Sequence, residues 1–98
     1  MDVEVKKVIL ERCKILLDIE NTNIYDDKLN ILIDAISTSI KKQVPFPKLT
    51  STWLNDYILL LSYKIAIEID IDINLNRFNN LYVTKLNEMR LNREWLNE

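Results

Sequence analysis

The spacing of the apolar residues most constrains this fold, because these residues recur every three or four positions over most of the chain. Such spacing places them on one face of an α-helix. Two runs are clear, and their members are Val5, Val8, Ile9, Cys13 and Leu16 in the first and Leu29, Leu32, Ile33, Ile36 and Ile40 in the second. The pattern predicts amphipathic helices that bury these faces together.

Breaks in the pattern set the expected ends of the helices. Pro45 and Pro47 cannot lie in a helix interior, so the second helix ends before them. Polar side chains that can accept hydrogen bonds from backbone N–H groups are expected as N-caps, namely Asp26 or Asp27 for the second helix, Ser51 or Thr52 for the third, and Asp72 or Asn74 for the fourth. The predicted helices span residues 3–19, 26–43, 51–69 and 74–93.

The stretch KIAIEIDIDINLN, residues 64–76, has an isoleucine or leucine at every second position and is open to three interpretations. A strand would need a partner, and no second alternating segment occurs in the chain. A calcium loop beginning at Asp70 would need glycine where Leu75 stands and a bidentate carboxylate where Leu81 stands. We therefore expect the third helix to end near Glu68 and a short connector to follow.

The predicted fold class is all-α, a four-helix antiparallel bundle-like array with short connectors. A chain of 98 residues suffices for one such domain with a single core. The third helix is apolar on two faces, and the second of these carries Trp53, Leu60 and Ile67. We expect this helix to be central in the domain and also to contact another chain through the second face.

The composition argues against several classes of function. Without glycine the chain cannot form a phosphate-cradling loop, and without histidine it lacks the commonest general base and metal ligand. Its one cysteine, Cys13, has no second sulfur for a disulfide, so a reducing compartment is expected. We expect no enzymatic activity and no metal or other cofactor. The longest uncharged apolar run, residues 57–63, is too short to cross a membrane.

A resemblance to a known family begins in the segment ILLDIENTNIYDDKLNILIDAISTSIKKQV, residues 15–44. It resembles the opening of the small phage head-tail connector (adaptor) proteins, in which a helix ends in a Leu-x-Ile turn and acids precede a Leu-x-x-Leu-Ile-x-x-Ala-like helix. The corresponding residues are Leu17, Ile19, Asp26, Asp27, Leu29, Leu32, Ile33, Ala35 and Ile40. The segments WLNDYILLLSYKIAIEI and LYVTKLNEMR stand where that family has its tyrosine-bearing third helix and its last helix, so the resemblance covers residues 5–90.

The resemblance implies a structural protein of the virion. Its copies would form a ring, commonly dodecameric in that family, that docks on the portal protein and meets further head-tail or tail-completion proteins. DNA would pass through the ring without sequence-specific binding. The chain would occur in the host cytoplasm during assembly and at the head-tail interface of the finished virion.

A closed ring of identical subunits needs two different contact patches on each subunit. The second apolar face of the third helix is one candidate. The other candidate comprises the C-terminal residues Arg90, Arg93, Trp95 and Leu96, since tryptophan and arginine are frequent interface anchors. Two simpler interpretations stay open, in which Trp53 only seals the core and Trp95 only folds back over the end of the bundle.

The alternative function is a small helical regulator that binds one host protein or operator DNA as a dimer. Between Arg77 and Arg93 the bases outnumber the single acid, Glu88. A surface that faces DNA would require such an excess of bases, but the excess is more typical of a solvated helix face. A stable dimer in solution would favour the regulator, whereas connector subunits often stay monomeric until a portal gathers them.

Overall fold

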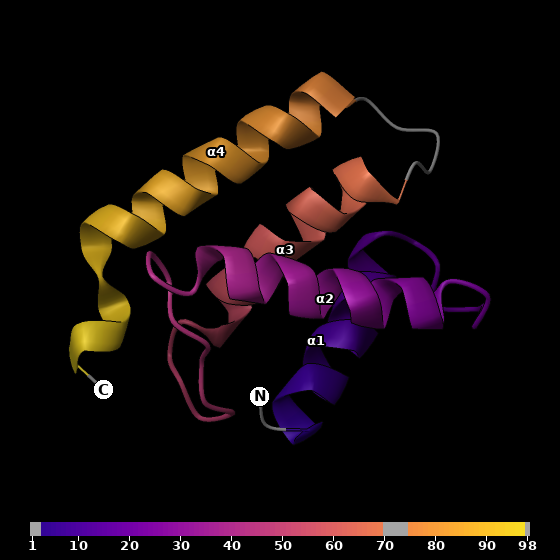
Figure 1. The fold of residues 1–98 in the computed structure, drawn as a ribbon, viewed down its shortest axis with the longest axis horizontal. Coiled ribbons are helices and arrows are strands. Elements are labelled where there is room, and N and C mark those ends of the chain that lie inside the picture. The colour runs from indigo at the N-terminus through magenta and orange to yellow at the C-terminus, as the bar shows by residue number, and fades with distance from the viewer. Residues whose placement is uncertain (1–2, 70–74, 98) are drawn as a thin grey trace.

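Helix α3, Leu54–Glu68, is the central element of the structure and packs against α1, α2 and α4. The computed structural model describes residues 3–69 and 75–97. The other helices are α1 Val3–Leu16, α2 Asp26–Ile40 and α4 Leu75–Asn92, and a short 3-10 helix, η1 Glu94–Asn97, follows them (Figure 1). Within the described ranges the chain forms helices and no strand, which confirms the all-α fold class.

The core lies where α1, α2 and α3 meet. Ile9 of α1, Ile33 of α2 and Leu61 of α3 are fully buried there, and burial of each such side chain contributes about 1.5–3 kcal/mol. Most residues of the two predicted apolar runs are buried in this core: Val5, Ile9, Cys13, Leu29, Ile33, Ile36 and Ile40. Leu16 differs, because it is the last residue of α1 and is half exposed.

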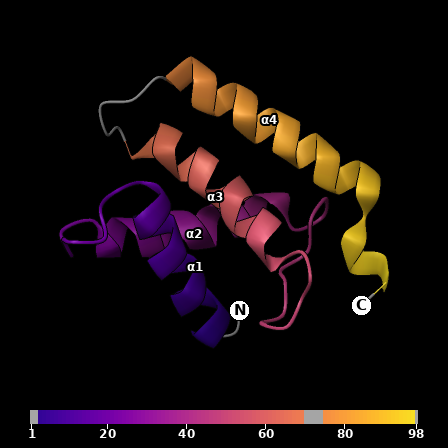
Figure 2. The same cartoon turned by 180° about the vertical axis from the view of Figure 1, so that it is seen from behind.

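Helix α4 lies beside α3, runs antiparallel to it and makes its main contacts with it (Figures 1 and 2). Its core-facing residues Phe78, Tyr82 and Leu86 are only partly buried, while Met89 is buried. With α3 as its main support, α4 leaves most of its own surface to solvent.

Helix α1 ends at Leu16, earlier than the predicted residue 19, because a Schellman motif closes it. The N–H of Ile19 donates to the carbonyl of Lys14 at 2.9 Å, and the N–H of Asp18 donates to that of Ile15 at 3.1 Å. Asp18 adopts the left-handed conformation, φ 58°, that this motif requires. Glycine usually fills this position, and the chain contains none.

The N-caps differ from the predicted ones. Tyr25 precedes α2 as its N-cap with no side-chain hydrogen bond, so Asp26 and Asp27 lie inside the first turn, where their charge still favours the helix dipole. Tyr25 is held there because it packs on the core. Trp53 is the N-cap of α3, and Ser51 instead accepts a hydrogen bond from the N–H of Lys48 at 3.0 Å.

Helices α2 and α3 are also shorter than predicted. Helix α2 ends at Ile40 and residues 41–43 form a turn, while α3 begins at Leu54 and not at residue 51. Helix α3 continues through Ile65 and Ile67 to Glu68, so this part of the alternating stretch is helical. The predicted caps Asp72 and Asn74 and the connector at residues 70–74 lie outside the described residues.

Candidate interaction surfaces

Four of the seven predicted contact residues come together at one end of the molecule. We call this region the C-terminal surface and define it by six residues: Lys42, Gln43, Arg90, Arg93, Trp95 and Leu96. They line an open hollow of about 360 Å³ between the end of α2, the end of α4 and η1. The sequence could not indicate Lys42 and Gln43 as members, because only the tertiary fold brings the end of α2 beside the end of α4.

The backbone conformation of Arg93 places η1 beside the end of α4 and so shapes this surface. Arg93 adopts the left-handed conformation, φ 47°, which among the described residues is otherwise found only at Asp18. Its N–H donates to the carbonyl of Met89 at 3.0 Å. The N–H of Leu96 then donates to the carbonyl of Arg93 at 3.0 Å. This reversal ends α4 and turns the chain into η1, which carries Trp95 back toward the core.

Trp95 packs edge to face against Trp53, with ring centroids 5.7 Å apart and an interplanar angle of 63°. Trp53 in turn contacts Tyr57 at 5.9 Å, and Tyr57 contacts Phe46 at 5.7 Å, both in edge-to-face geometry. Such pairs contribute about 0.5–1.5 kcal/mol each beyond their buried area. Trp95 therefore folds back over the end of the core, while its neighbour Leu96 remains 65% exposed.

The C-terminal surface is basic. Lys42, Arg90 and Arg93 are exposed, and none of them is paired with another residue in the part of the chain that the structure describes. Leu96 of the same surface is 65% exposed, and Leu91, which follows Arg90 in the sequence, is 83% exposed. Apolar side chains surrounded by charged groups are typical of protein interfaces with a polar rim.

The predicted contact face on α3 is mostly covered within the chain. Trp53 is 2% exposed and Leu60 is fully buried, so neither is available to a partner, and this corrects the prediction for both residues. The cause is α4 and η1, which cover this face of α3. Ile67, near the other end of α3, remains partly exposed.

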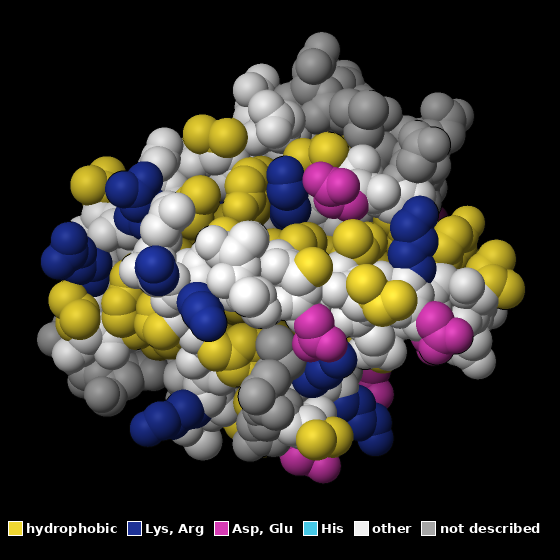
Figure 3. All heavy atoms as spheres, viewed as in Figure 1, with side chains coloured by type: hydrophobic (Ala, Val, Ile, Leu, Met, Phe, Trp, Pro, Cys, Tyr) yellow, Lys and Arg dark blue, Asp and Glu magenta, His cyan; other side chains and the backbone are white. Residues whose placement is uncertain are grey.

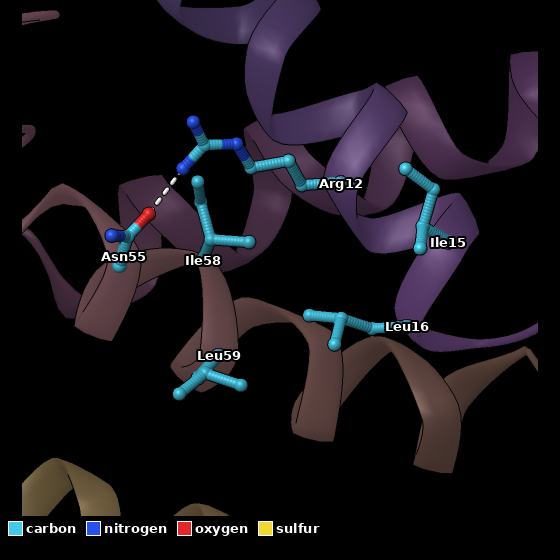
Figure 4. Close-up of a pocket in the computed structure, with 6 residues that line it drawn as sticks. All are labelled: Arg12, Ile15, Leu16, Asn55, Ile58 and Leu59. Carbon is cyan, nitrogen blue, oxygen red and sulfur yellow. Dashed lines mark hydrogen bonds between the residues drawn. The ribbon is translucent and has the colours of Figure 1, made fainter.

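A second surface, which the sequence analysis did not single out, is an apolar groove between α1 and α3 (Figure 4). We call it the α1–α3 groove and define it by its lining residues: Arg12, Ile15, Leu16, Asn55, Ile58 and Leu59. Its volume is about 320 Å³. Arg12 donates a hydrogen bond to Asn55 across one end of the groove. The available sequence signal was Ile15, an isoleucine outside the predicted apolar face of α1 that is 61% exposed.

The buried polar groups belong to the core and not to a reactive site. Burial raises the pKa of the Cys13 thiol to about 11, against a smaller lowering by its hydrogen bond with the Ser62 hydroxyl, whose oxygen lies 3.1 Å away. The Tyr57 hydroxyl donates to Ser37 at 3.0 Å, and burial raises the pKa of this phenol to about 12. Both groups are neutral near pH 7, so the thiol has little nucleophilic character.

The described residues form neither a metal-binding cluster nor a membrane-spanning helix. Across residues 3–69 and 75–97, no three His, Cys, Asp or Glu side chains lie close enough together to hold a metal ion. None of the helices formed by those residues has both the length and the apolar character needed to cross a membrane.

No protein-family profile, curated protein or solved structure matches this chain.

Proposed function

We propose that this chain is a subunit of a phage head-tail connector, a structural virion protein that forms a ring between the portal and the tail. The sequence resemblance over residues 5–90 and the small all-α fold support this proposal. The ring, dodecameric as is common in the family, would dock on the portal protein and receive further head-tail or tail-completion proteins. DNA would pass through it without being read.

The observation that carries the proposal is the presence of two different candidate contact surfaces on one chain. The C-terminal surface is built by α2, α4 and η1, and the α1–α3 groove by α1 and α3, with no residue in common. A subunit in a closed ring contacts its two neighbours through different patches, and one that also docks on a portal needs a further contact. A protein with one self-complementary patch would instead form a dimer.

The charge distribution fits a channel through which DNA slides. The net charge is −2. One of the bases on α4, Lys85, is already paired with Asp56 at 3.2 Å and with Glu88 at 3.4 Å. Because tight binding to DNA depends on many unpaired bases that release counterions, this chain would hold DNA only weakly.

The test is recovery of partners from cells that produce the phage encoding this chain. A tagged copy is purified, its partners are identified by mass spectrometry, and the complexes are imaged by negative-stain electron microscopy. We expect a large portal protein and ring-bearing or tail-bearing complexes. Recovery of one host protein or of a lone dimer, with no capsid or tail component, would instead support the regulator.

A matched pair of variants ties the result to the C-terminal surface. Leu96→Asp should reduce recovery of the portal or of ring complexes, because it places a buried charge in a contact. Ile31→Asp is the control, since Ile31 has nearly the same exposure, 68% against 65%, but belongs to neither surface. If both variants reduced recovery of the portal or of ring complexes equally, the C-terminal surface would not be the contact responsible.

A further inference from the structure

The end of the molecule that carries the C-terminal surface is basic beyond the surface itself. Lys41 and Lys48 lie close by in the sequence and are also exposed. Figure 3 shows Lys and Arg side chains over the left end, where α2 and α4 finish, with no described Asp or Glu among them in this view. Counted by sequence over residues 39–50 and 89–98, five bases stand against two acids.

The opposite end of the longest axis, 37 Å in extent, carries the connection between α1 and α2 (Figure 1). We call residues 17–28 the acidic turn. Three of its acids are exposed and are paired with no other described residue: Asp18, Glu20 and Asp27. The fourth, Asp26, forms an ion pair with Lys14 at 2.8 Å, and Lys28 is the only base within the acidic turn.

Asp18 is a poor residue for its own local structure. It occupies the left-handed position that closes α1, φ 58°, where a side chain costs about 1 kcal/mol more than glycine. Its negative charge also lies at the C-terminal end of α1, where the helix dipole favours a base. Residues that break a local rule in this way are often kept for a function outside the local structure.

Exposed apolar side chains accompany the charges at both ends. Leu91 and Leu96 are 83% and 65% exposed at the basic end, and Ile24 is 79% exposed in the acidic turn. We infer that the C-terminal surface of one copy docks on the acidic turn of a second copy, head to tail, with these apolar residues inside a rim of opposite charges. This inference deepens the proposed function and rests on it for the choice of a second copy as partner.

The size of the contact sets its strength. The two shorter extents of the molecule, 30 and 19 Å, give its end a cross-section of roughly 570 Å², which is small beside the approximately 800 Å² of accessible surface that each partner buries in a stable interface. Each contact alone is therefore weak, and closure of a ring or gathering on a template would be needed for lasting assembly. Because the two surfaces differ, association does not stop at two copies.

Sedimentation equilibrium of the full chain tests the inference. At about 0.01 M ionic strength, where charges act over roughly 30 Å, we expect concentration-dependent association beyond the dimer, and we expect its loss at about 1 M. A species that stops at two copies, association insensitive to salt, or a monomer at low salt and millimolar concentration would each overturn the inference. The recovery of a portal protein tests the proposed function independently of sedimentation. If the chain were monomeric but still captured a portal, the inference would fail and the proposed function would not.

Charge reversal identifies the paired surfaces. Lys42→Glu with Arg90→Glu reverses the basic end, and Glu20→Lys with Asp27→Lys reverses the acidic turn. Each variant alone should associate at least about tenfold more weakly than the natural chain, and an equimolar mixture of the two should regain association because opposite ends face each other again. Failure of the mixture to associate, with both variants folded by circular dichroism, would contradict the pairing.

Two controls separate specific pairing from net charge. Lys6→Glu with Lys7→Glu gives the same net charge as the reversed basic end but leaves both ends unchanged, so this variant alone should still associate as the natural chain does. Its loss of association would show that net charge, and not the pairing of the two ends, controls association. Lys28→Glu should strengthen association of the natural chain, because it removes the only base of the acidic turn. Weaker association of that variant would count against the inference.

Asp18→Asn gives a readout that a merely structural role would not produce. Asparagine tolerates the left-handed conformation and lacks the charge, so the variant should unfold at a slightly higher temperature while it associates less. Unchanged association would show that Asp18 takes no part in the contact.

Discussion

Helices α3 and α4 lie side by side, yet their packing differs throughout their length. Helix α3 contacts every other helix, and eight of its residues are buried, including Tyr57 and Leu61. On α4 only Met89 is buried among the described side chains. An element held mainly from one side opens more easily than a central one. The molecule thus combines a firm core of α1, α2 and α3 with a more weakly held α4 and η1, which carry most of the C-terminal surface.

The largest expected effect follows from removing a side chain of α3. Leu61→Ala should lower the free energy of unfolding by about 2–5 kcal/mol, because it leaves a cavity at a fully buried site. Leu86→Ala on the half-buried face of α4 should cost clearly less. Urea denaturation measures both changes, and equal losses would mean that α4 belongs to the core as firmly as α3 does.

The dependence of stability on pH should also differ between α3 and α4, because each helix carries a buried or partly buried tyrosine. The pKa of Tyr57 is raised to about 12 by burial, from an ordinary value of 10, so the folded state favours the neutral phenol. The stability associated with this shift is fully present below pH 10 and is lost as the pH rises toward 12, by about 2–3 kcal/mol. Burial also raises the pKa of Tyr82 on α4.

The check is urea denaturation of two variants at pH 8 and at alkaline pH. Tyr57→Phe should cost about 1 kcal/mol at neutral pH, through loss of its hydrogen bond to Ser37, but should then lose less stability than the natural chain at high pH. Tyr82→Phe should change the alkaline loss less. The reverse order of the two variants would contradict the difference in burial between the helices.

Removal of the indole that holds η1 should have a smaller and more local effect. Trp95→Ala deletes the contact with Trp53 and should lower stability by about 1–2 kcal/mol. Amide hydrogen exchange should accelerate most in the last turns of α4 and least in α3. Trp95→Phe should retain part of the protection, and uniform acceleration across the chain would show that α4 does not open separately.

The smallest effect concerns the ion pairs between α3 and α4. Burial alone would lower the pKa of Lys85, but hydrogen bonds and charges from Asp56 and Glu88 outweigh it and raise the pKa. Lys85→Met should cost about 0.5 kcal/mol or less, and the difference should shrink in high salt. Thermal unfolding at low and high salt measures it. Glu68→Gln is the control within one helix, because it removes the i,i+4 pair with Lys64 but leaves Lys64 over the ring of Tyr82 on α4.

The apolar spacing was sufficient to predict four helices and most of the core, because burial of one face per helix depends only on the period of the sequence. Helix ends were predicted less well. The ends of α1 and α2 depended on turn geometry, and the start of α3 depended on Ser51 being used in the preceding turn by Lys48. These hydrogen bonds form between short segments and leave no periodic signal.

The candidate surfaces required the tertiary structure. Arg90, Arg93, Trp95 and Leu96 could be grouped from the sequence because they are close along the chain. Their neighbour Lys42 could not, because it is almost fifty residues away. The burial of Trp53 and Leu60 was also not predictable, since a helix with two apolar faces can be covered by its own chain or by another.

The edge-to-face contact between Trp53 and Trp95 makes the protein its own optical reporter. These are the only two tryptophans in the chain, so all indole fluorescence comes from the junction between η1 and the core. Release of η1 would bring Trp95 into water, shift the emission to longer wavelength and remove the coupled near-ultraviolet circular dichroism of the ring pair. Because Trp95 is itself part of the C-terminal surface, occupation of that surface can be followed by its fluorescence in unlabelled protein.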